Sequence, residues 1–471
     1  MKKIKTLNRI YSVILVMLFL FLCGCKRLGN GNENSSLDTT SYTLSFTERP
    51  FNNDEIDFGK VGTVSTGKIK DESNTQEVTV GEGRKVGDVI YKSINYNEIK
   101  AVWISYIDLE NMLKGRSEKD YTNNIKAAFK TCADLGINTV IFQVRPFGDA
   151  LYESKLFPWS SYASGSLSTS PGFDPLKIAV EAAHNNDLSL HAWVNPYRCV
   201  DESSVGKIAN DFLIKKWYND SSKKGNWIVT VDGRLFLNPA IPEVRQLLVD
   251  GIDEIVRNYK VDGVQLDDYF YPTTQASFDE ASFKTYGNGL SLADFRRNNV
   301  SVLIADIYSK IKSIDKSVLF GISPQANISN DINSQYIDIN TICRKSGYID
   351  YICPQIYYNY QSETTDFLSS LKEWNGIVLN TGTKLCIGIA AYKVGQTDTW
   401  ACTAATSKKE CSNKSECGAN GWINSGTDIM KRQYNDSKKA NNYLGVFFFR
   451  YESLISLSNE EKQNLKDAMN T

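Results

Sequence analysis

The chain has 471 residues, of which 42% are hydrophobic and 23% charged, so it can bury a sizeable core and is not a disordered protein. Its 53 Lys and Arg residues nearly balance its 54 Asp and Glu residues, for a formal net charge of −1. That balance leaves no overall field to hold a polyanion, so nucleic acid is not expected as a partner.

The N-terminus has the layout of a secretory signal, with basic residues before an apolar run at positions 11–22. The run is shorter than the roughly 20 residues of a transmembrane helix. It ends in Leu22-Cys23-Gly24-Cys25, which resembles the lipobox of bacterial lipoproteins. Residues 1–25 are therefore predicted to be a lipoprotein signal with Cys25 as the lipidated residue, and an uncleaved anchor is the alternative. We expect an exported protein that is held by lipid on the cell membrane and faces outside the cytoplasm.

The next segment, residues 26–96, is rich in Asn, Ser, Thr, Gly and charged residues and has few clustered apolar positions. Such a composition provides little to drive collapse, so it predicts a polar tether. Two short alternating pieces, residues 41–46 and 77–80, are candidate edge strands.

From residue 97 onward, short β-rich apolar runs alternate with stretches of helical periodicity, as expected of βα units and a parallel sheet. Eight such runs are AVWISYI from Ala101, NTVIFQV from Asn138, LSLHAWV from Leu188, DGVQLD from Asp262, VLFGISP from Val318, YIDYICPQIY from Tyr348, KLCIGIA from Lys384 and LGVFFFRY from Leu444.

The expected helices include residues 123–135, 175–185, 242–259 and 292–314, where apolar residues recur at spacings of three and four. Eight strands, each followed by a helix, predict an α/β fold of the (β/α)8 TIM-like barrel type over residues 97–471, with loop insertions and the N-terminal lipoprotein tether. The excess length is expected after strands two and three and between residues 392 and 428. A doubly wound sheet is the competitor, but no glycine-rich phosphate motif follows any strand.

Chemistry in such barrels lies at the carboxyl ends of the strands. Polar and aromatic side chains gather there, as in a sugar site, where rings stack on Trp and Tyr and hydroxyls need amide, carboxylate and guanidinium partners. The candidate substrate-binding residues are Arg145, Asp149, His191, Trp193, Asn195, Tyr271, Gln355 and Tyr357.

Glycoside hydrolysis also needs two carboxyl groups, and Asp267 and Asp268 at the end of strand four are the candidates. Adjacent strand residues point to opposite faces, so one of the two is expected to turn away from the barrel axis. If Asp267 shares the inward parity of Gln265, it is the nucleophile or electrostatic stabiliser, and Asp268 is the acid or a residue that orients it. In the competing structural interpretation, one Asp caps the following loop or pairs with Arg145.

Several of these residues have a structural alternative. His191 is either a substrate ligand or a satisfied inner residue of the barrel, and Arg145 is either a ligand or part of a structural salt bridge. Trp103 is expected in the core, and His184 at the surface or at a helix cap. With only two histidines in the chain, no metal site and no cofactor are predicted.

Ten cysteines are present, and Cys353 and Cys386 lie in apolar runs as expected of core residues. Cys402, Cys411 and Cys417 lie in a polar segment of an exported chain. A disulfide among these three is predicted, and a zinc site is the alternative, although CxxC pairs and a nearby His are missing.

Four longer blocks, QVRPFGDALYES from Gln143, HAWVNPYR from His191, VDGVQLDDYFYP from Val261 and CPQIYY from Cys353, resemble the bacterial glycosyl-hydrolase-like family ten. The resemblance implies a TIM-barrel glycosidase on the cell surface, with members that act on peptidoglycan glycan strands, in particular strands stripped of their peptides. It implies that the family's motif aspartates are Asp267 and Asp268. The family's strand-end polar residues then correspond to Arg145, Asp149, His191, Asn195, Tyr271 and Gln355. The Cys-containing stretch between residues 397 and 424 departs from the family pattern.

Together these features predict a membrane-anchored glycoside hydrolase that acts on cell-envelope glycan by carboxylate acid/base catalysis. A glycan-binding lipoprotein without catalysis is the alternative, because strand five ends without a Glu or Asp. A purely structural or adhesive lipoprotein leaves the polar strand ends unexplained.

Overall fold

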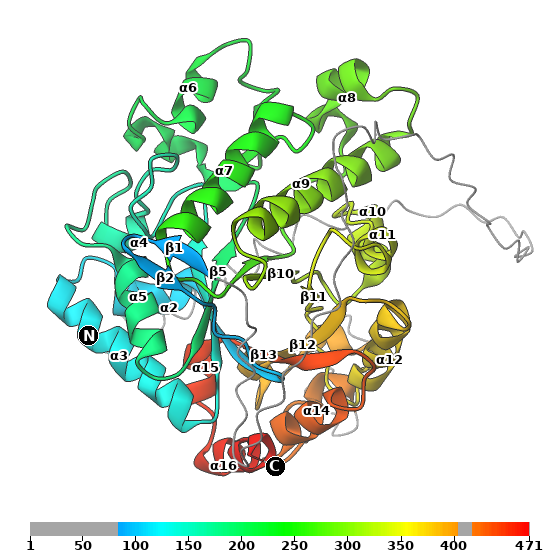
Figure 1. Ribbon diagram of the computed structural model, residues 1–471. Coiled ribbons are helices and arrows are strands. Elements are labelled where there is room, and N and C mark those ends of the chain that lie inside the picture. Colours follow the sequence, from blue (N-terminus) through cyan, green and yellow to red (C-terminus); the bar gives the residue numbers. More distant parts are fainter. Residues whose placement is uncertain (1–82, 404–416, 471) are drawn as a thin grey trace, which may run out of the picture. The chain divides into compact units, whose positions relative to one another are not determined.

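The computed structural model describes residues 83–403 and 417–470. Eight parallel strands of this part of the chain close into a barrel and follow one another around it in chain order, which confirms the predicted fold (Figure 1). The barrel strands are β3 (Ile99–Ile104), β4 (Thr139–Arg145), β5 (Ser189–Val194), β9 (Gly263–Leu266), β10 (Leu319–Ile322), β11 (Tyr351–Ile352), β12 (Lys384–Ala390) and β13 (Tyr443–Phe449).

Helices between the strands surround the barrel (Figure 1). They are α2 (Tyr106–Met112), α3 (Glu118–Asp134), α4 (Ser161–Ser164), α5 (Pro175–His184), α7 (Pro242–Asn258), α8 (Glu280–Tyr286), α9 (Leu292–Ile314), α10 (Ile328–Asn333), α11 (Ile339–Arg344), α12 (Phe367–Val378), α14 (Ile429–Ser437), α15 (Tyr451–Ile455) and α16 (Asn459–Met469).

The predicted helices match α3, α5, α7 and α9, and a side-chain cap begins α3, α5 and α9. Pro242 begins α7 at a position where its missing N–H costs nothing. The helix α3 begins five residues earlier than predicted because the Ser117 side chain caps it by accepting a hydrogen bond from the Asp120 N–H.

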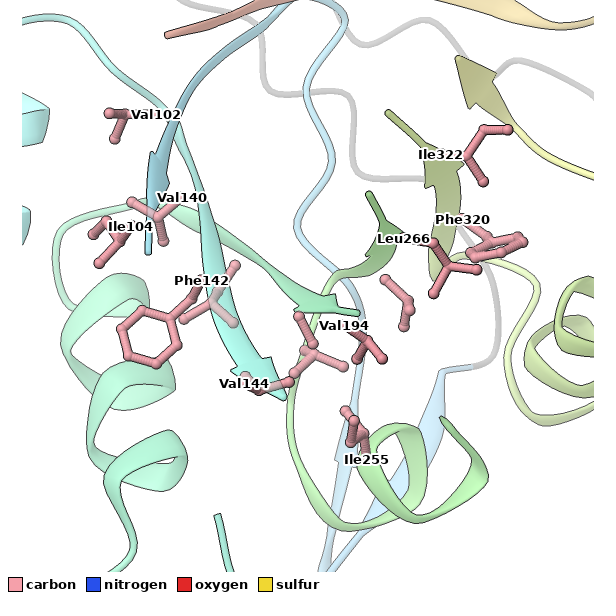
Figure 2. Packing of buried hydrophobic residues seen from close by; sticks show 14 of the residues in the cluster. Val102, Ile104, Val140, Phe142, Val144, Val194, Ile255, Leu266, Phe320 and Ile322 are labelled. Carbon is pink, nitrogen blue, oxygen red and sulfur yellow. The ribbon is translucent and has the colours of Figure 1, made fainter. Parts of the chain in front are cut away.

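The hydrophobic core has two parts. Outward side chains of the strands, such as Val102, Phe142 and Leu266, pack beneath the helices, where Figure 2 shows them with Ile255 of α7. Inward side chains, including Trp103 as predicted, fill the barrel itself. The barrel is therefore a packed core whose chemistry is confined to its ends.

Two glycines make room for large rings inside the barrel. A Cβ on Gly263 would lie 2.6 Å from the His191 ring, and one on Gly321 would lie 2.2 Å from the Tyr351 ring. The His191 Nδ1 and the Tyr351 hydroxyl lie 3.1 Å apart, at hydrogen-bond distance. His191 is thus a satisfied inner residue of the barrel, and burial lowers its pKa to about 4, so it is neutral.

The predicted tether ends earlier than residue 96. The strands β1 (Arg84–Val86) and β2 (Val89–Tyr91) form an antiparallel hairpin, and the buried Arg84 guanidinium lies 3.0 Å from Asp315. It also donates to the carbonyl oxygens of Val256, Tyr259 and Val261. These contacts attach the hairpin to the amino-terminal end of the barrel. The polar composition of the segment gives no sign of this attachment.

His184 is not a plain surface residue. Its ring stacks on Tyr91 of the hairpin, and its Nε2 lies 3.1 Å from the buried Asp262 carboxylate. Asp262 also accepts hydrogen bonds from the backbone N–H groups of Ile94 and Leu190. His184 therefore helps to attach the hairpin to the barrel.

The largest insertion follows β5. It contains a three-stranded sheet of β6 (Arg198–Asp201), β7 (Ile228–Val231) and β8 (Arg234–Leu237), the 3₁₀ helix η2 (Glu202–Lys207) and the helix α6 (Leu213–Asn219). Shorter 3₁₀ turns are η3 (Ala276–Phe278), η4 (Ala391–Lys393), η5 (Thr399–Ala401) and η6 (Gly418–Asn420). This insertion lies after the third barrel strand, as predicted.

Among the residues that the structure describes, no helix has both the length and the apolar character needed to cross a bilayer. The predicted signal with Cys25, the candidate edge strands at residues 41–46 and 77–80, and Cys411 lie outside the described residues.

Candidate active site

The two predicted catalytic aspartates lie together at the carboxyl end of β9. Asp267 is 4% exposed and Asp268 is 9% exposed. Asp267 accepts hydrogen bonds from Asn195 Nδ2 and from the Tyr269 N–H, and Asp268 accepts one of 3.2 Å from Gln325 Nε2. Contrary to expectation, Asp268 does not turn away from the site, because the strand ends at Leu266 and the chain then directs Asp268 toward the end of the neighbouring β10.

Two amide side chains, those of Gln143 and Asn195, form a chain of hydrogen bonds that ends at Asp267. Gln143 at the end of β4 accepts a hydrogen bond from the Tyr106 N–H and donates one of 2.6 Å to Asn195 Oδ1. Asn195 in turn donates to Asp267. Each amide is oriented by its neighbour, so the nitrogen of Asn195 faces the carboxylate.

Burial raises the pKa of Asp267 to about 7, and repulsion from Asp268 is the second cause. Burial also raises the pKa of Asp268, while its hydrogen bond from Gln325 opposes this rise. Two buried carboxyls that repel each other titrate as a pair. Burial and mutual repulsion thus favour a state in which one carboxyl keeps its proton while the other is ionised, as an acid and a carboxylate require.

A buried arginine lies beside the pair. The Arg198 guanidinium is 4.6 Å from the Phe147 ring centroid and 4.5 Å from that of Tyr269, and Nε donates to the Pro146 carbonyl oxygen. Its charge lowers the pKa of Asp267 and that of Asp268. Arg198, and not Arg145, is thus the cation that favours an ionised carboxylate here.

Partly exposed aromatic rings surround the carboxyl end of the barrel on two sides. Tyr106 and Phe147 lie with their centroids 5.0 Å apart on one side. On the other, Tyr357 contacts Phe449 at 5.8 Å and Tyr392 at 5.9 Å. Burial and the charge of Asp268 both raise the pKa of Tyr357, which places this ring near the carboxyl pair.

Of the other predicted ligands, Trp193, Asn195, Gln355 and Tyr357 lie at this end of the barrel. Trp193 is 7% exposed and fills the top of the barrel interior. Gln355 donates to the Ser323 carbonyl oxygen and contributes to stabilising the Asp268 anion. Asp149 lies in the loop after β4, where it accepts a hydrogen bond from the Phe147 N–H and is only 1% exposed, so it holds the loop.

Arg145 lies outside the site. The β4–β5 register shifts between Gln143 and Arg145, so Arg145 pairs with the outward-facing Val194. Its guanidinium lies 4.2 Å from the Phe157 ring centroid, and a Cβ on Gly251 of α7 would lie 2.3 Å from Arg145 Nη1. The predicted ligand role is wrong, because this bulge turns the side chain beneath α7.

His191 and Tyr271 are also structural. His191 is buried in the barrel against Tyr351. Tyr271 is 2% exposed in the loop after β9, with its ring edge-on to Tyr336 at 5.2 Å and beside the Arg296 guanidinium. That guanidinium forms a fully buried ion pair of 2.6 Å with Asp279, so Tyr271 packs the loop that follows the catalytic strand.

The sequence prediction missed three residues that contact or tune the aspartates: Gln143, Arg198 and Gln325. Gln143 lies near the end of the second β-rich run and Gln325 directly follows the fifth, so both carry the same positional signal as the residues that were chosen. Arg198 begins an inserted strand, and its approach to the site depends on a loop path that no periodicity indicates.

The predicted cysteine cluster lies after β12. One ligand atom each of Cys402, Cys417 and Glu363 lies within 4.8 Å of the others. Glu363 accepts hydrogen bonds from the N–H groups of Thr403 and Gly418, which follow the two cysteines. The prediction of a disulfide or metal ligand pair among these residues remains a prediction.

Residues 98–402 match the family model described as Glycosyl hydrolase-like 10. The chain belongs to this family. Glycosyl hydrolase DigH of Escherichia coli (strain K12) is 35% identical over 339 residues, which cover 68% of this chain and 73% of DigH. Glycosyl hydrolase YngK of Bacillus subtilis (strain 168) is 34% identical over 321 residues, 63% of this chain and 61% of YngK. The predicted family is confirmed, and with it the glycoside hydrolase class.

Solved glycoside hydrolases are similar at lower identity. The glycoside hydrolase domain of PgaB (BpsB) from Bordetella bronchiseptica is 10% identical with a TM-score of 0.47, covering 79% of this chain and 98% of that domain. The catalytic domain of β-amylase from Paenibacillus polymyxa is also 10% identical with a TM-score of 0.47, covering 80% and 98%.

Proposed function

We propose that this protein hydrolyses O-glycosidic bonds in the glycan strands of peptidoglycan, as a lipoprotein held on the outer side of the cell membrane by Cys25. The observation that carries the proposal is the pair of adjacent buried carboxyls, Asp267 and Asp268, at the carboxyl end of the barrel. Hydrolysis of a glycoside needs one proton donor and one carboxylate at the anomeric carbon, and a pair that holds one proton provides both.

The surroundings of the pair support a saccharide as the substrate. Tyr106, Phe147 and Tyr269 lie on one side of it and Tyr357 and Tyr392 on the other, each with part of its ring exposed. The apolar faces of sugar rings pack on such side chains. The relatives DigH and YngK, both named glycosyl hydrolases, support the same reaction class. Peptidoglycan is supported by the lipoprotein signal, which would hold the enzyme beside that polymer.

The test uses the full chain, purified in detergent, with intact and with peptide-free peptidoglycan. Wild type is expected to generate new reducing ends, faster on the peptide-free strands. Asp267→Asn and Asp268→Asn are each expected to lower the rate at least about 100-fold, because each removes one of the two required groups. The matched control is Asp134→Asn on α3, a carboxylate that is 61% exposed and far along the chain from the site.

The glycan-binding alternative gives a different result. Under it, wild type and both variants bind peptide-free strands in a pull-down and release no reducing ends from any glycan. Sustained release of reducing ends by wild type and by both aspartate variants would also contradict the proposal, since it would place catalysis elsewhere.

The membrane attachment has its own test. Cells that express the protein and grow with an alkyne-tagged fatty acid are expected to label wild type and not Cys25→Ala. Equal labelling of both, or of neither, would contradict lipidation at Cys25.

A further inference from the structure

The two catalytic carboxyls extend from one wall of the barrel. Asp267 and Asp268 are consecutive residues after the last residue of β9. In most glycosidases, two carboxyls stand on opposite sides of the anomeric carbon, one to protonate the departing oxygen and one to attack or to activate water. Two side chains from one strand end reach a bound sugar from the same side, so the opposite face needs another nucleophile.

Other buried carboxyls at this end of the barrel are already engaged, among them Asp108 and Asp398, which form ion pairs with Arg450 and Lys393. Asp149 accepts a hydrogen bond of 2.8 Å from the Phe147 N–H and is 1% exposed. Asp331 accepts one of 3.1 Å from the Gln325 N–H and is 0% exposed. Asp149 and Asp331 thus hold loops, and neither carboxyl reaches solvent. Neither is therefore positioned to attack a bound sugar.

The environments of the two aspartates differ in a way that separates their roles. Asp267 receives two N–H donors, from Asn195 and from the Tyr269 backbone, which favour an anion in a fixed orientation. The Trp193 side chain also lowers the pKa of Asp267 by hydrogen bonding to the anion. Asp268 receives one amide from Gln325 and is the more exposed of the two, so it is the one placed to exchange a proton with a leaving group.

We propose that the missing nucleophile is the substrate's own 2-acetamido group, so that the enzyme is specific for glycosides of 2-acetamido-2-deoxy sugars. This inference rests on the proposed function and names the chemistry of its substrate. Asp267 accepts a hydrogen bond from the acetamido N–H and orients the group, and Asp268 is the general acid and base.

The reaction balances in two steps. The acetamido carbonyl oxygen attacks the anomeric carbon, the bond from that carbon to the glycosidic oxygen breaks, and the departing oxygen takes the proton of Asp268. This gives a cyclic oxazolinium ion, whose positive charge faces the Asp267 carboxylate. Water then attacks the anomeric carbon, returns a proton to Asp268, and restores the acetamido group. The anomeric configuration is retained, since the anomeric carbon is inverted twice.

The test compares two forms of peptide-free glycan strands, one with native N-acetyl groups and one that is de-N-acetylated and then re-acylated with trifluoroacetyl groups. Fluorine withdraws electrons from the carbonyl oxygen and weakens it as a nucleophile. Wild type is expected to cleave the trifluoroacetylated strands at least about 100-fold more slowly, a loss in the bond-breaking step itself. The anomer released first, followed by NMR, is expected to keep the configuration of the substrate.

Variants separate a positioning role from a structural one. Asp267→Asn is expected to lower kcat for the native strands and to lessen the difference between the two substrates, because the acetamido group is no longer oriented. Asp268→Ala, assayed with azide, is expected to form a glycosyl azide of retained configuration. Asp134→Asn is the matched control and is expected to keep the wild-type ratio.

The outcomes distinguish this inference from the proposed function. Hydrolysis with inversion, or equal rates on both substrates, would overturn the inference and leave glycoside hydrolysis intact. Absence of hydrolysis on every strand would overturn both.

Discussion

At the scale of single residues, Arg198 sets the protonation of the catalytic pair. Its charge lowers the pKa of both carboxyls, although burial still raises that of Asp267 to about 7. Removing that charge in Arg198→Gln is expected to raise both pKa values further. Asp268, the proposed proton donor, then keeps its proton to higher pH, so the alkaline limb of the kcat profile moves to higher pH.

The measurement is kcat for peptide-free strands between pH 5 and 9, with Arg234→Gln as the control. The Arg234 guanidinium lies 4.9 Å from the same Phe147 ring but pairs with Asp201, so its removal is expected to leave the limb in place. An unchanged profile in Arg198→Gln, or the same displacement in both variants, would contradict this role.

Single residues also show where sequence reasoning succeeds and fails. The parity argument is sound for Gln265, which accepts a hydrogen bond from Trp103 Nε1 inside the barrel, because β9 is regular up to Leu266. The same parity argument fails for Arg145, because a bulge after Gln143 reverses the face and leaves no mark in the amino-acid pattern. For His191 a signal did exist, since Gly263 lacks the side chain that would otherwise fill its space.

At the scale of elements, the β1–β2 hairpin is held by one buried cation. Arg84 is 4% exposed and donates to Asp315 and to three backbone carbonyl oxygens. Arg84→Ala leaves these buried acceptors without their donor and is expected to lower the free energy of unfolding by about 3 kcal/mol. Urea unfolding of the full chain measures this loss.

Lys85→Ala in the same strand is the matched control, because Lys85 is exposed. It is expected to change the free energy of unfolding by less than about 0.5 kcal/mol. Equal midpoints for the two variants would show that the hairpin adds nothing to the stability of the barrel.

A second element-scale prediction concerns the cysteines after β12. Oxidised glutathione is expected to accept the two hydrogens of the Cys402 and Cys417 thiols and leave a disulfide between them, because their sulfur atoms lie within 4.8 Å. By its loop length, this bond is expected to stabilise the fold by about 3 kcal/mol. Peptide mapping by mass spectrometry identifies the pair, and thermal unfolding with and without reductant measures the effect.

The alternative, a zinc site with Glu363, is tested on the reduced protein. Stoichiometric zinc bound by wild type and lost in Glu363→Gln, together with thiols that resist oxidation, would replace the disulfide with a metal site. Cys132 and Cys343 are the internal controls, because both are buried in the main core and are expected to stay reduced.

At the scale of the whole molecule, the barrel was predictable because each strand and helix carries its own period. All eight strands and the four predicted helices are found where apolar runs and spacings place them. The hairpin was not predictable, because Arg84 gains its partners from residues 172 to 231 positions away. Composition alone identifies the hairpin segment only as polar. The oxygen atoms that accept hydrogen bonds from Arg84 are brought together only when the barrel folds.

The site makes the whole fold respond to pH. Asp267 has its pKa raised from the ordinary value of 3.8 to about 7, so between these pH values the folded state binds a proton that the unfolded chain has released. Stability from this group is therefore complete below about pH 4 and is lost as pH rises toward 7. His191 acts in the opposite sense, because its pKa is lowered to about 4 and its stability contribution is lost as pH falls.

Because these contributions overlap, the difference between wild type and Asp267→Asn isolates the aspartate. The variant is expected to unfold about 2–4 °C higher than wild type at pH 8, because wild type then buries the charge of the ionised Asp267 and the variant does not. At pH 4 the carboxyl is protonated in folded wild type, so this advantage is expected to disappear. Thermal unfolding followed by circular dichroism at the two pH values measures the difference. Asp134→Asn, at an exposed position, is expected to show none. A variant less stable than wild type at pH 8 would mean that the hydrogen bonds from Asn195 and Tyr269 outweigh the cost of burying the charge, and that the pKa of Asp267 is not raised.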